Sequence, residues 1–271
     1  MNKLKILSLP YAIWVCLFTV VPMLIVLFFA LTTKTGDFTI ANISYVGKYF
    51  SVLIRSILLA AVVTLITLII AYPFAYILSR MSPKTSRFIL LLVILPMWLN
   101  FLLRIYAWLA ILEKNGLLNR FLLFVGLHKL NIINTKIAVA IAMIYNYLPF
   151  MILPLVSTIS KIDNGVIEAA QDLGANSFLV FRKIISPLSM PGVTSGINMV
   201  FVPAVSTFII SRMLGGGSNL LIGDLIDMQF LGSVYNPHVG AAISLILMIL
   251  TLLCMSLLNQ FGEENVEGKI V

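Results

Sequence analysis

Six long apolar runs divide this chain of 271 residues, and shorter polar segments separate them. Each run has 21 to 26 residues, whereas a helix needs only about 20 apolar residues to cross the hydrocarbon core of a bilayer. The runs are continuous and do not alternate as the strands of a membrane barrel would. We therefore predict a single all-α transmembrane domain over residues 1–271 with six transmembrane helices. The predicted spans are residues 7–31, 54–79, 88–112, 137–160, 193–213 and 239–260.

Charged residues are nearly confined to the segments between the runs. Within the six runs only Arg55, Arg104 and Arg212 are charged. Arg55 and Arg212 lie near run ends, where a long side chain can reach the interface. Arg104 lies deeper, and an intramembrane charge is usually paired or functional. We expect Arg104 to pair with Asn100 or with carbonyls of a neighbouring span, and a cation-repelling gate is the second hypothesis.

The composition agrees with this pattern and excludes several classes of protein. Hydrophobic residues make up 61% of the chain and charged residues 10%, against roughly 45–50% and about 25% in soluble domains. A disordered chain, a nucleic-acid-binding domain and an ordinary soluble enzyme are excluded. The net charge of +8 suits contact with membrane lipid. In a six-span topology, however, the basic residues divide equally between the two sides and do not orient the chain.

The sequence offers no catalytic, cofactor or metal site. There is no GxxxxGK[ST] phosphate-binding loop, so any ATP hydrolysis is expected in a partner subunit. The two histidines, His128 and His238, lie far apart in loops. The two cysteines, Cys16 and Cys254, fall inside apolar runs and are expected to be buried thiols.

The segment 161–192 is the longest connection with an architecture of its own. Asp163 or Asn164 can cap a short helix, and a glycine after Leu173 is a natural helix stop. A second short helix is expected to begin at a Ser177 cap and to end before the proline at 187. Apolar residues recur at helical spacing in both helices, at Ile167, Ala170 and Leu173 and then at Phe178, Phe181 and Ile185. Taken alone, this segment could be a surface connector between spans four and five.

The residues of this segment carry a resemblance. Glu168-Ala169-Ala170, a glycine a few residues later and then spaced isoleucine and proline resemble the EAA motif of ABC-importer permeases. The resemblance implies a type I ABC-importer permease fold in which this loop is cytoplasmic. It would dock as a coupling helix on the ATP-hydrolysing subunit, with both chain termini cytoplasmic in the bacterial cell membrane. The implied coupling residues are Glu168, Ala169, Ala170, Asp172 and Gly174.

Weaker motifs elsewhere extend the resemblance to permeases of the spermidine/putrescine type. They are Ala71-Tyr72-Pro73-Phe74-Ala75-Tyr76, Leu103-Arg104-Ile105-Tyr106, Leu148-Pro149-Phe150-Met151, Leu214-Gly215-Gly216 and Asn219-Leu220-Leu221-Ile222-Gly223. This implies a subunit that passes polyamines inward. The implied partners are two copies of an ATP-binding subunit, a second and unlike permease, and an extracytoplasmic polyamine-binding protein.

Candidates for the translocation pathway follow from polar and aromatic residues in or near the spans. A polycation is best held by carboxylates and aromatic faces, yet the spans contain no Asp or Glu. This suits a passage that does not trap the solute. Asp224 and Asp227 could face an outer vestibule or could simply be solvated loop carboxylates. The candidates are Tyr147, Asn198, Arg104, Trp98, Tyr106, Asp224 and Asp227.

Three alternatives remain at this point. Related importers for other small organic solutes share much of the pattern. An ion-coupled secondary transporter would often carry charged residues near the midplane, and the spans lack carboxylates. A membrane-embedded enzyme would need a clustered polar site, which the sequence does not indicate.

Overall fold

The computed structural model describes residues 10–11, 13–217, 219–232 and 234–267, with side-chain surroundings given to residue 260. The described chain is helical apart from loops and one isolated bridge between Thr32 and Phe38. In chain order the helices of the first half are η1 (Cys16–Val20), α2 (Val21–Ala30), α3 (Ala41–Val46), η2 (Gly47–Tyr49), α4 (Phe50–Arg80), α5 (Pro83–Ile94), η3 (Leu95–Trp98), α6 (Phe101–Leu112) and α7 (Leu117–Phe124). Those of the second half are α8 (Lys136–Ile159), α9 (Asn164–Asp172), α10 (Ser177–Val180), η4 (Phe181–Ile185), α11 (Ser186–Leu188), α12 (Met190–Val205), α13 (Ile209–Leu214), α14 (Ile222–Phe230) and α15 (Pro237–Glu267).

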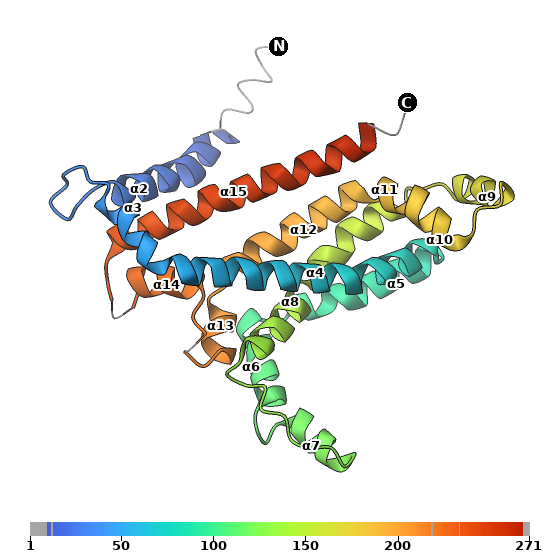
Figure 1. Ribbon diagram of the computed structural model, residues 1–271, viewed down its shortest axis with the longest axis horizontal. Coiled ribbons are helices and arrows are strands. Elements are labelled where there is room, and N and C mark those ends of the chain that lie inside the picture. Colours follow the sequence, from blue (N-terminus) through green and yellow to red (C-terminus); the bar gives the residue numbers. More distant parts are fainter. Residues whose placement is uncertain (1–9, 12, 218, 233, 268–271) are drawn as a thin grey trace, which may run out of the picture.

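The long helices lie side by side, and short helices gather at the two ends (Figure 1). Four helical stretches are long and apolar enough to cross a membrane: Ile13–Ala30, Ala41–Arg80, Lys136–Ile159 and Pro237–Gln260. Two bent helix pairs raise the number of candidate spans to six if each pair crosses once. The prediction of an all-helical, multi-span fold is confirmed.

The third predicted span, 88–112, is not one straight helix. Its two arms, Pro83–Trp98 and Phe101–Phe124, meet at 91°. Pro96 has no backbone N–H to donate, and Asn100 starts a new helix because its Oδ1 accepts from the backbone N–H of Leu102 at 2.8 Å. The second arm, α6 and α7, points away from the bundle (Figure 1).

The fifth predicted span, 193–213, is also interrupted. α12 ends at Val205, and α13 begins only at Ile209. Pro203 lies in the last turn of α12, and the hydroxyl of Ser206 donates to the carbonyl of Val202 at 3.1 Å, in competition with the helix backbone. This apolar run is therefore a helix, a break at residues 206–208 and a second short helix.

The helix after the coupling turn differs from its prediction at both ends. The cap is Asn176 and not Ser177, because Asn176 Oδ1 accepts from the N–H of Leu179 at 2.8 Å. The helix also continues past Pro187 to Leu188, through the wide π turn Phe181–Ile185. A π turn breaks the usual hydrogen-bond ladder and so accommodates a proline that cannot donate. This helix meets α12 at 63°.

Two glycines bring α12 into close contact with α8. Gly192 and Gly196 are four residues apart, the small-xxx-small spacing of tightly packed membrane helices. A Cβ at Gly192 would lie 2.9 Å from the carbonyl oxygen of Pro154, and one at Gly196 would lie 2.6 Å from the sulfur of Met151. α8 and α12 are thus packed backbone to backbone on either side of the coupling segment.

Candidate functional site: the coupling turn and the outer charge cluster

The coupling segment forms a capped turn at one end of the molecule (Figure 1). Asp163 caps α9, since its Oδ1 accepts from the N–H of Gly165 at 2.9 Å. At the other end Gly174 has φ +86°. The N–H of Gly174 bonds to the carbonyl of Gln171 at 2.8 Å and that of Ala175 to the carbonyl of Ala170 at 3.0 Å. This pair of bonds around a left-handed glycine is the Schellman motif, which fixes the turn between α9 and α10.

The predicted coupling residues lie together on this turn. Glu168, Ala169, Asp172 and Gly174 are exposed, and Ala170 is half-buried. Because Glu168 and Asp172 are four apart on α9, their carboxylates share one face. Of the predicted apolar face of α9, Ile167 and Ala170 are half-buried, but the side chain of Leu173 is 90% exposed. The turn therefore offers small, acidic and apolar groups to solvent, and no residue that the structure describes covers Leu173.

Arg80, at the end of α4, ties the coupling segment to the bundle. Its Nη1 donates to the carbonyl of Ile162 at 3.4 Å and to the side-chain oxygen of Asn164, the first residue of α9. The guanidinium lies 5.5 Å from the ring centroid of Tyr76. The sequence indicated only a charge at a membrane surface here, because the partners lie more than 80 residues away.

Tyr72 supplies a second tie from α4. Its hydroxyl lies 2.6 Å from that of Ser189, at the bend into α12. Its ring packs edge-on against Phe181, with 5.5 Å between centroids. The coupling segment is thus held by α4 as well as by α8 and α12, the two helices that sequence reasoning identified.

We expect Arg80→Ala to lower transport without preventing membrane insertion. The change leaves the carbonyl of Ile162 and the side chain of Asn164 without their donor. A hydrogen bond to a charged group contributes about 1.5–3 kcal/mol of stability, which is lost here. α9 can then move without moving α4. Arg87→Ala removes an exposed arginine of α5 and is the matched control. Uptake and ATP hydrolysis measured together test this: equal loss of uptake in both variants would contradict the anchoring role.

Two of the pathway candidates connect helices. Tyr147 of α8 is buried, and its hydroxyl donates to the carbonyl of Pro203 in α12 at 3.2 Å. Asn198 of α12 donates from Nδ2 to Oδ1 of Asn259 in α15 at 2.9 Å. Both contacts are interhelical hydrogen bonds of the kind that stabilise membrane bundles.

The aromatic candidates lie on or next to the bent arm and face outward. Trp98 is 79% exposed and Tyr106 is 58% exposed. Arg104 lies one turn into α6, with its guanidinium 5.6 Å from the ring of Phe101. Its buried Nε has no hydrogen-bond partner in the part of the chain that the structure describes. A bond from Arg104 to the Asn100 side chain is likewise absent among the described residues, and the Asn100 oxygen caps α6.

The outer carboxylates are neither solvated nor free. Asp224 is fully buried, and Asp227 is mostly buried. Arg212 of α13 contacts both: its Nη2 lies 2.5 Å from Asp227 Oδ2, and its Nε lies 3.9 Å from Asp224 Oδ1. Both acids belong to α14, outside the long membrane-crossing helices. Arg212, which was expected to extend alone toward the interface, is the partner that sequence reasoning missed.

Burial raises the pKa of the Asp224 carboxyl above its ordinary value. Hydrogen bonds from the Ser211 hydroxyl at 2.6 Å and the Leu221 N–H at 2.8 Å oppose this shift, as does the charge of Arg212. The arrangement keeps a carboxylate beneath the surface, with a guanidinium above it.

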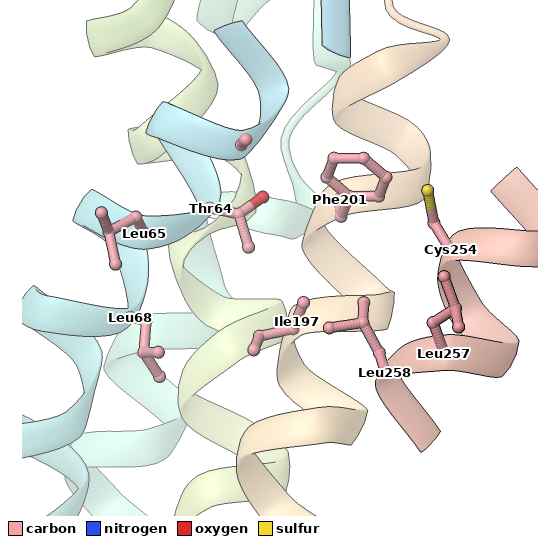
Figure 2. Close-up of a pocket in the computed structure, with 9 residues that line it drawn as sticks. Thr64, Leu65, Leu68, Ile197, Phe201, Cys254, Leu257 and Leu258 are labelled. Atoms are coloured by element: carbon pink, nitrogen blue, oxygen red, sulfur yellow. The ribbon is translucent and has the colours of Figure 1, made fainter. Parts of the chain in front are cut away.

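The structure also contains an apolar cavity of about 390 Å³ between α4, α12 and α15. Figure 2 shows Thr64 and Leu68 on one side and Phe201 and Cys254 on the other. Among the residues whose side chains the structure describes, none that lines it is charged. An apolar cavity of this kind does not suit a polycation. Among the described residues no group of His, Cys, Asp and Glu could hold a metal ion.

The amino-acid sequence is similar to those of known transport permeases. Residues 71–263 match the family described as the inner membrane component of binding-protein-dependent transport systems. The spermidine/putrescine transport system permease protein PotB of Haemophilus influenzae is 40% identical, over 94% of this chain and 93% of that protein. PotB of Escherichia coli is 39% identical over 87% and 89%. The inner membrane ABC transporter permease protein YdcU of Escherichia coli is 29% identical over 84% and 77%.

The fold itself matches a solved transporter. A chain of a bacterial ABC transporter involved in the import of the acidic polysaccharide alginate superposes with a TM-score of 0.77. The match covers 97% of this chain and 95% of that chain at 17% sequence identity. This likeness establishes the architecture of an ABC-importer permease.

Proposed function

Because this chain belongs to the family of binding-protein-dependent transport system inner membrane components, we propose that it passes polyamines into the cytoplasm as one permease subunit of an ATP-driven importer. It is a multi-pass inner membrane protein and the permease, not the ATPase, of an ABC transporter. Membership of this family implies an ATPase and a binding protein as partners.

The observation that carries the proposal is the exposed coupling turn with its ties to α4. A rigid, capped helix that is uncovered on its outer side is suited to docking on another subunit. Arg80 and Tyr72 connect it to α4, and the chain itself connects it to α8 and α12. Movement of the ATPase can therefore be passed to three helices as a rigid-body shift.

The orientation follows from the same turn. The ATPase acts in the cytoplasm, so we place α9 on that side. The last turns of α15 point toward the end of the molecule that carries α9 (Figure 1). We therefore place the C-terminus in the cytoplasm, and the N-terminus with it. α13 and α14 lie toward the end opposite α9 (Figure 1), which this proposed orientation places outside the cytoplasm.

Polyamines are the proposed solutes because of the resemblance over nearly the whole chain and because of the charge distribution. Relatives at 39–40% identity are named spermidine/putrescine permeases. The predicted spans hold no carboxylate that would trap a polycation. In this proposal an extracytoplasmic binding protein supplies recognition. Two ATPase copies and a second, unlike permease complete the importer within the lipid bilayer.

An anionic solute is the second candidate, favoured by the buried Nε of Arg104, which has no hydrogen-bond partner among the described residues. One panel distinguishes the two. The assembled importer is reconstituted in vesicles, and ATP hydrolysis is measured with spermidine, putrescine or an anionic oligosaccharide, each with its binding protein. We expect stimulation by a polyamine. Stimulation by the anion alone would reject the polyamine assignment and keep the permease assignment.

A further inference from the structure

The contact between Arg212 and the two carboxylates of α14 has the chemistry of a cation-binding site that is already filled. One guanidinium faces Asp227 at 2.5 Å and Asp224 at 3.9 Å. Two carboxylates thus share one positive charge. The side chain of Arg212 is 48% exposed, whereas Asp224 is fully buried and Asp227 is 16% exposed. The cation lies on the outside of the cluster and the anions lie beneath it.

A second observation shows that the cluster is incompletely satisfied. Oδ2 of Asp224 accepts from the Ser211 hydroxyl and from the N–H of Leu221. Oδ1 is buried and has no hydrogen-bond partner among the residues that the structure describes. The nearest cation is Arg212 Nε, which at 3.9 Å is too far to donate a hydrogen bond. A buried carboxylate oxygen therefore faces the guanidinium without being bonded to it.

The cluster is also in contact with the helices that would move. The N–H of Ile222, at the start of α14, donates to Ser56 of α4 at 2.8 Å. A Cβ on Gly223 would lie 2.4 Å from the carbonyl oxygen of Ser206, in the break between α12 and α13. α14 therefore presses directly on the point where α12 ends. α14, which carries both carboxylates, thus contacts α4 and the end of α12.

We propose that Arg212 is a displaceable counter-ion, and that the ammonium group of an incoming polyamine replaces it on Asp227 and Asp224. This inference rests on the proposed function. A guanidinium and an alkylammonium are both cations that donate several hydrogen bonds, so they compete for the same carboxylates. Displacement frees Arg212 to move outward into solvent. It also loosens α13 from α14 next to the break in α12.

The test compares the two partners of the ion pair. Equilibrium binding of labelled spermidine is measured on the assembled permease–ATPase complex without added binding protein. If Arg212 competes with the solute, the complex with Arg212→Gln binds spermidine at least about threefold more tightly than the wild type. The complex with Asp227→Asn binds it at least about threefold more weakly. Shifts of this size are expected because the ion pair is partly exposed. Arg120→Gln removes an exposed arginine of α7 and should leave binding unchanged. Arg212→Lys should bind between the wild type and Arg212→Gln.

A purely structural ion pair predicts the opposite pattern. Loss of either partner would then weaken binding in the same direction, and this result would overturn the proposal. If Arg212→Gln fails to assemble, unchanged binding in Arg212→Lys would overturn it as well. ATP-driven uptake of spermidine by the wild type is measured in parallel. If the wild type shows no uptake, the proposed function is rejected. If wild-type uptake is normal but spermidine affinity changes in the same direction in Arg212→Gln and Asp227→Asn, only the counter-ion role is rejected.

Discussion

Gly174→Asp is expected to abolish solute uptake while the protein still inserts and assembles. The backbone at Gly174 has φ +86°, in the left-handed region that L-residues avoid at a cost of roughly 1–2 kcal/mol. Apart from Gly174 itself and its two chain neighbours, no described heavy atom lies within 4 Å of the position that a Cβ would take. The aspartate is therefore not rejected by the chain itself but adds bulk and charge to the surface proposed to meet the ATPase. Uptake should fall about tenfold or more, which corresponds to ~1.4 kcal/mol of lost coupling.

The chain supplies a matched control for this change. Gly126, after α7, has φ +84° and is likewise free of heavy atoms within 4 Å of a Cβ. Gly126→Asp therefore imposes the same backbone strain and the same charge at the other end of the molecule. We expect its uptake to stay near that of the wild type. Equal losses in the two variants would mean that backbone strain, and not the docking surface, explains the Gly174 effect.

Gly192→Ala is expected to have the largest effect on assembly. A Cβ there would lie 2.9 Å from the backbone oxygen of Pro154 and 2.7 Å from Oγ1 of Thr158. The backbone of a helix cannot shift without breaking its own hydrogen bonds. Overpacking of this kind lowers the stability of a protein by about 1–3 kcal/mol. α12 must therefore move away from α8. The thermal stability of the purified complex should fall clearly.

Two other glycines calibrate this result. Gly196→Ala meets the end of the flexible Met151 side chain at 2.6 Å and should cost less. Gly47→Ala meets nothing within 4 Å and should be neutral. Stability should therefore decrease in the order Gly47, Gly196, Gly192. A Gly192 variant as stable as the Gly47 variant would contradict the close packing of α8 on α12.

The sequence predicted well whatever depends on local pattern. Continuous apolar runs indicated membrane-crossing helices, and α4, α8 and α15 follow them closely. A cap at Asp163 or Asn164 and a turn at Gly174 were also predicted, since both depend on residues within one turn, and the structure selects Asp163. The bends were not. Hydropathy continues across Pro96 and across the break after Val205, and so concealed both interruptions.

Contacts between distant segments could not be predicted from one sequence. Arg80 meets Asn164 across 84 positions, and Tyr72 meets Ser189 across 117. Each residue alone suggested only an interfacial charge or a packed aromatic ring. Arg212 and Asp227 are 15 positions apart, but the two helices that carry them, α13 and α14, had to be placed before the pair could be recognised.

ATP-driven spermidine accumulation in sealed vesicles tests the central claim most directly. The importer is reconstituted with the wild-type chain, with Gly174→Asp or without this subunit, and labelled spermidine is counted inside. We predict accumulation for the wild type only with hydrolysable ATP and binding protein, and background levels for the other two. Equal accumulation with the Gly174→Asp chain, or accumulation without this subunit, would contradict a polyamine permease driven through the α9 turn.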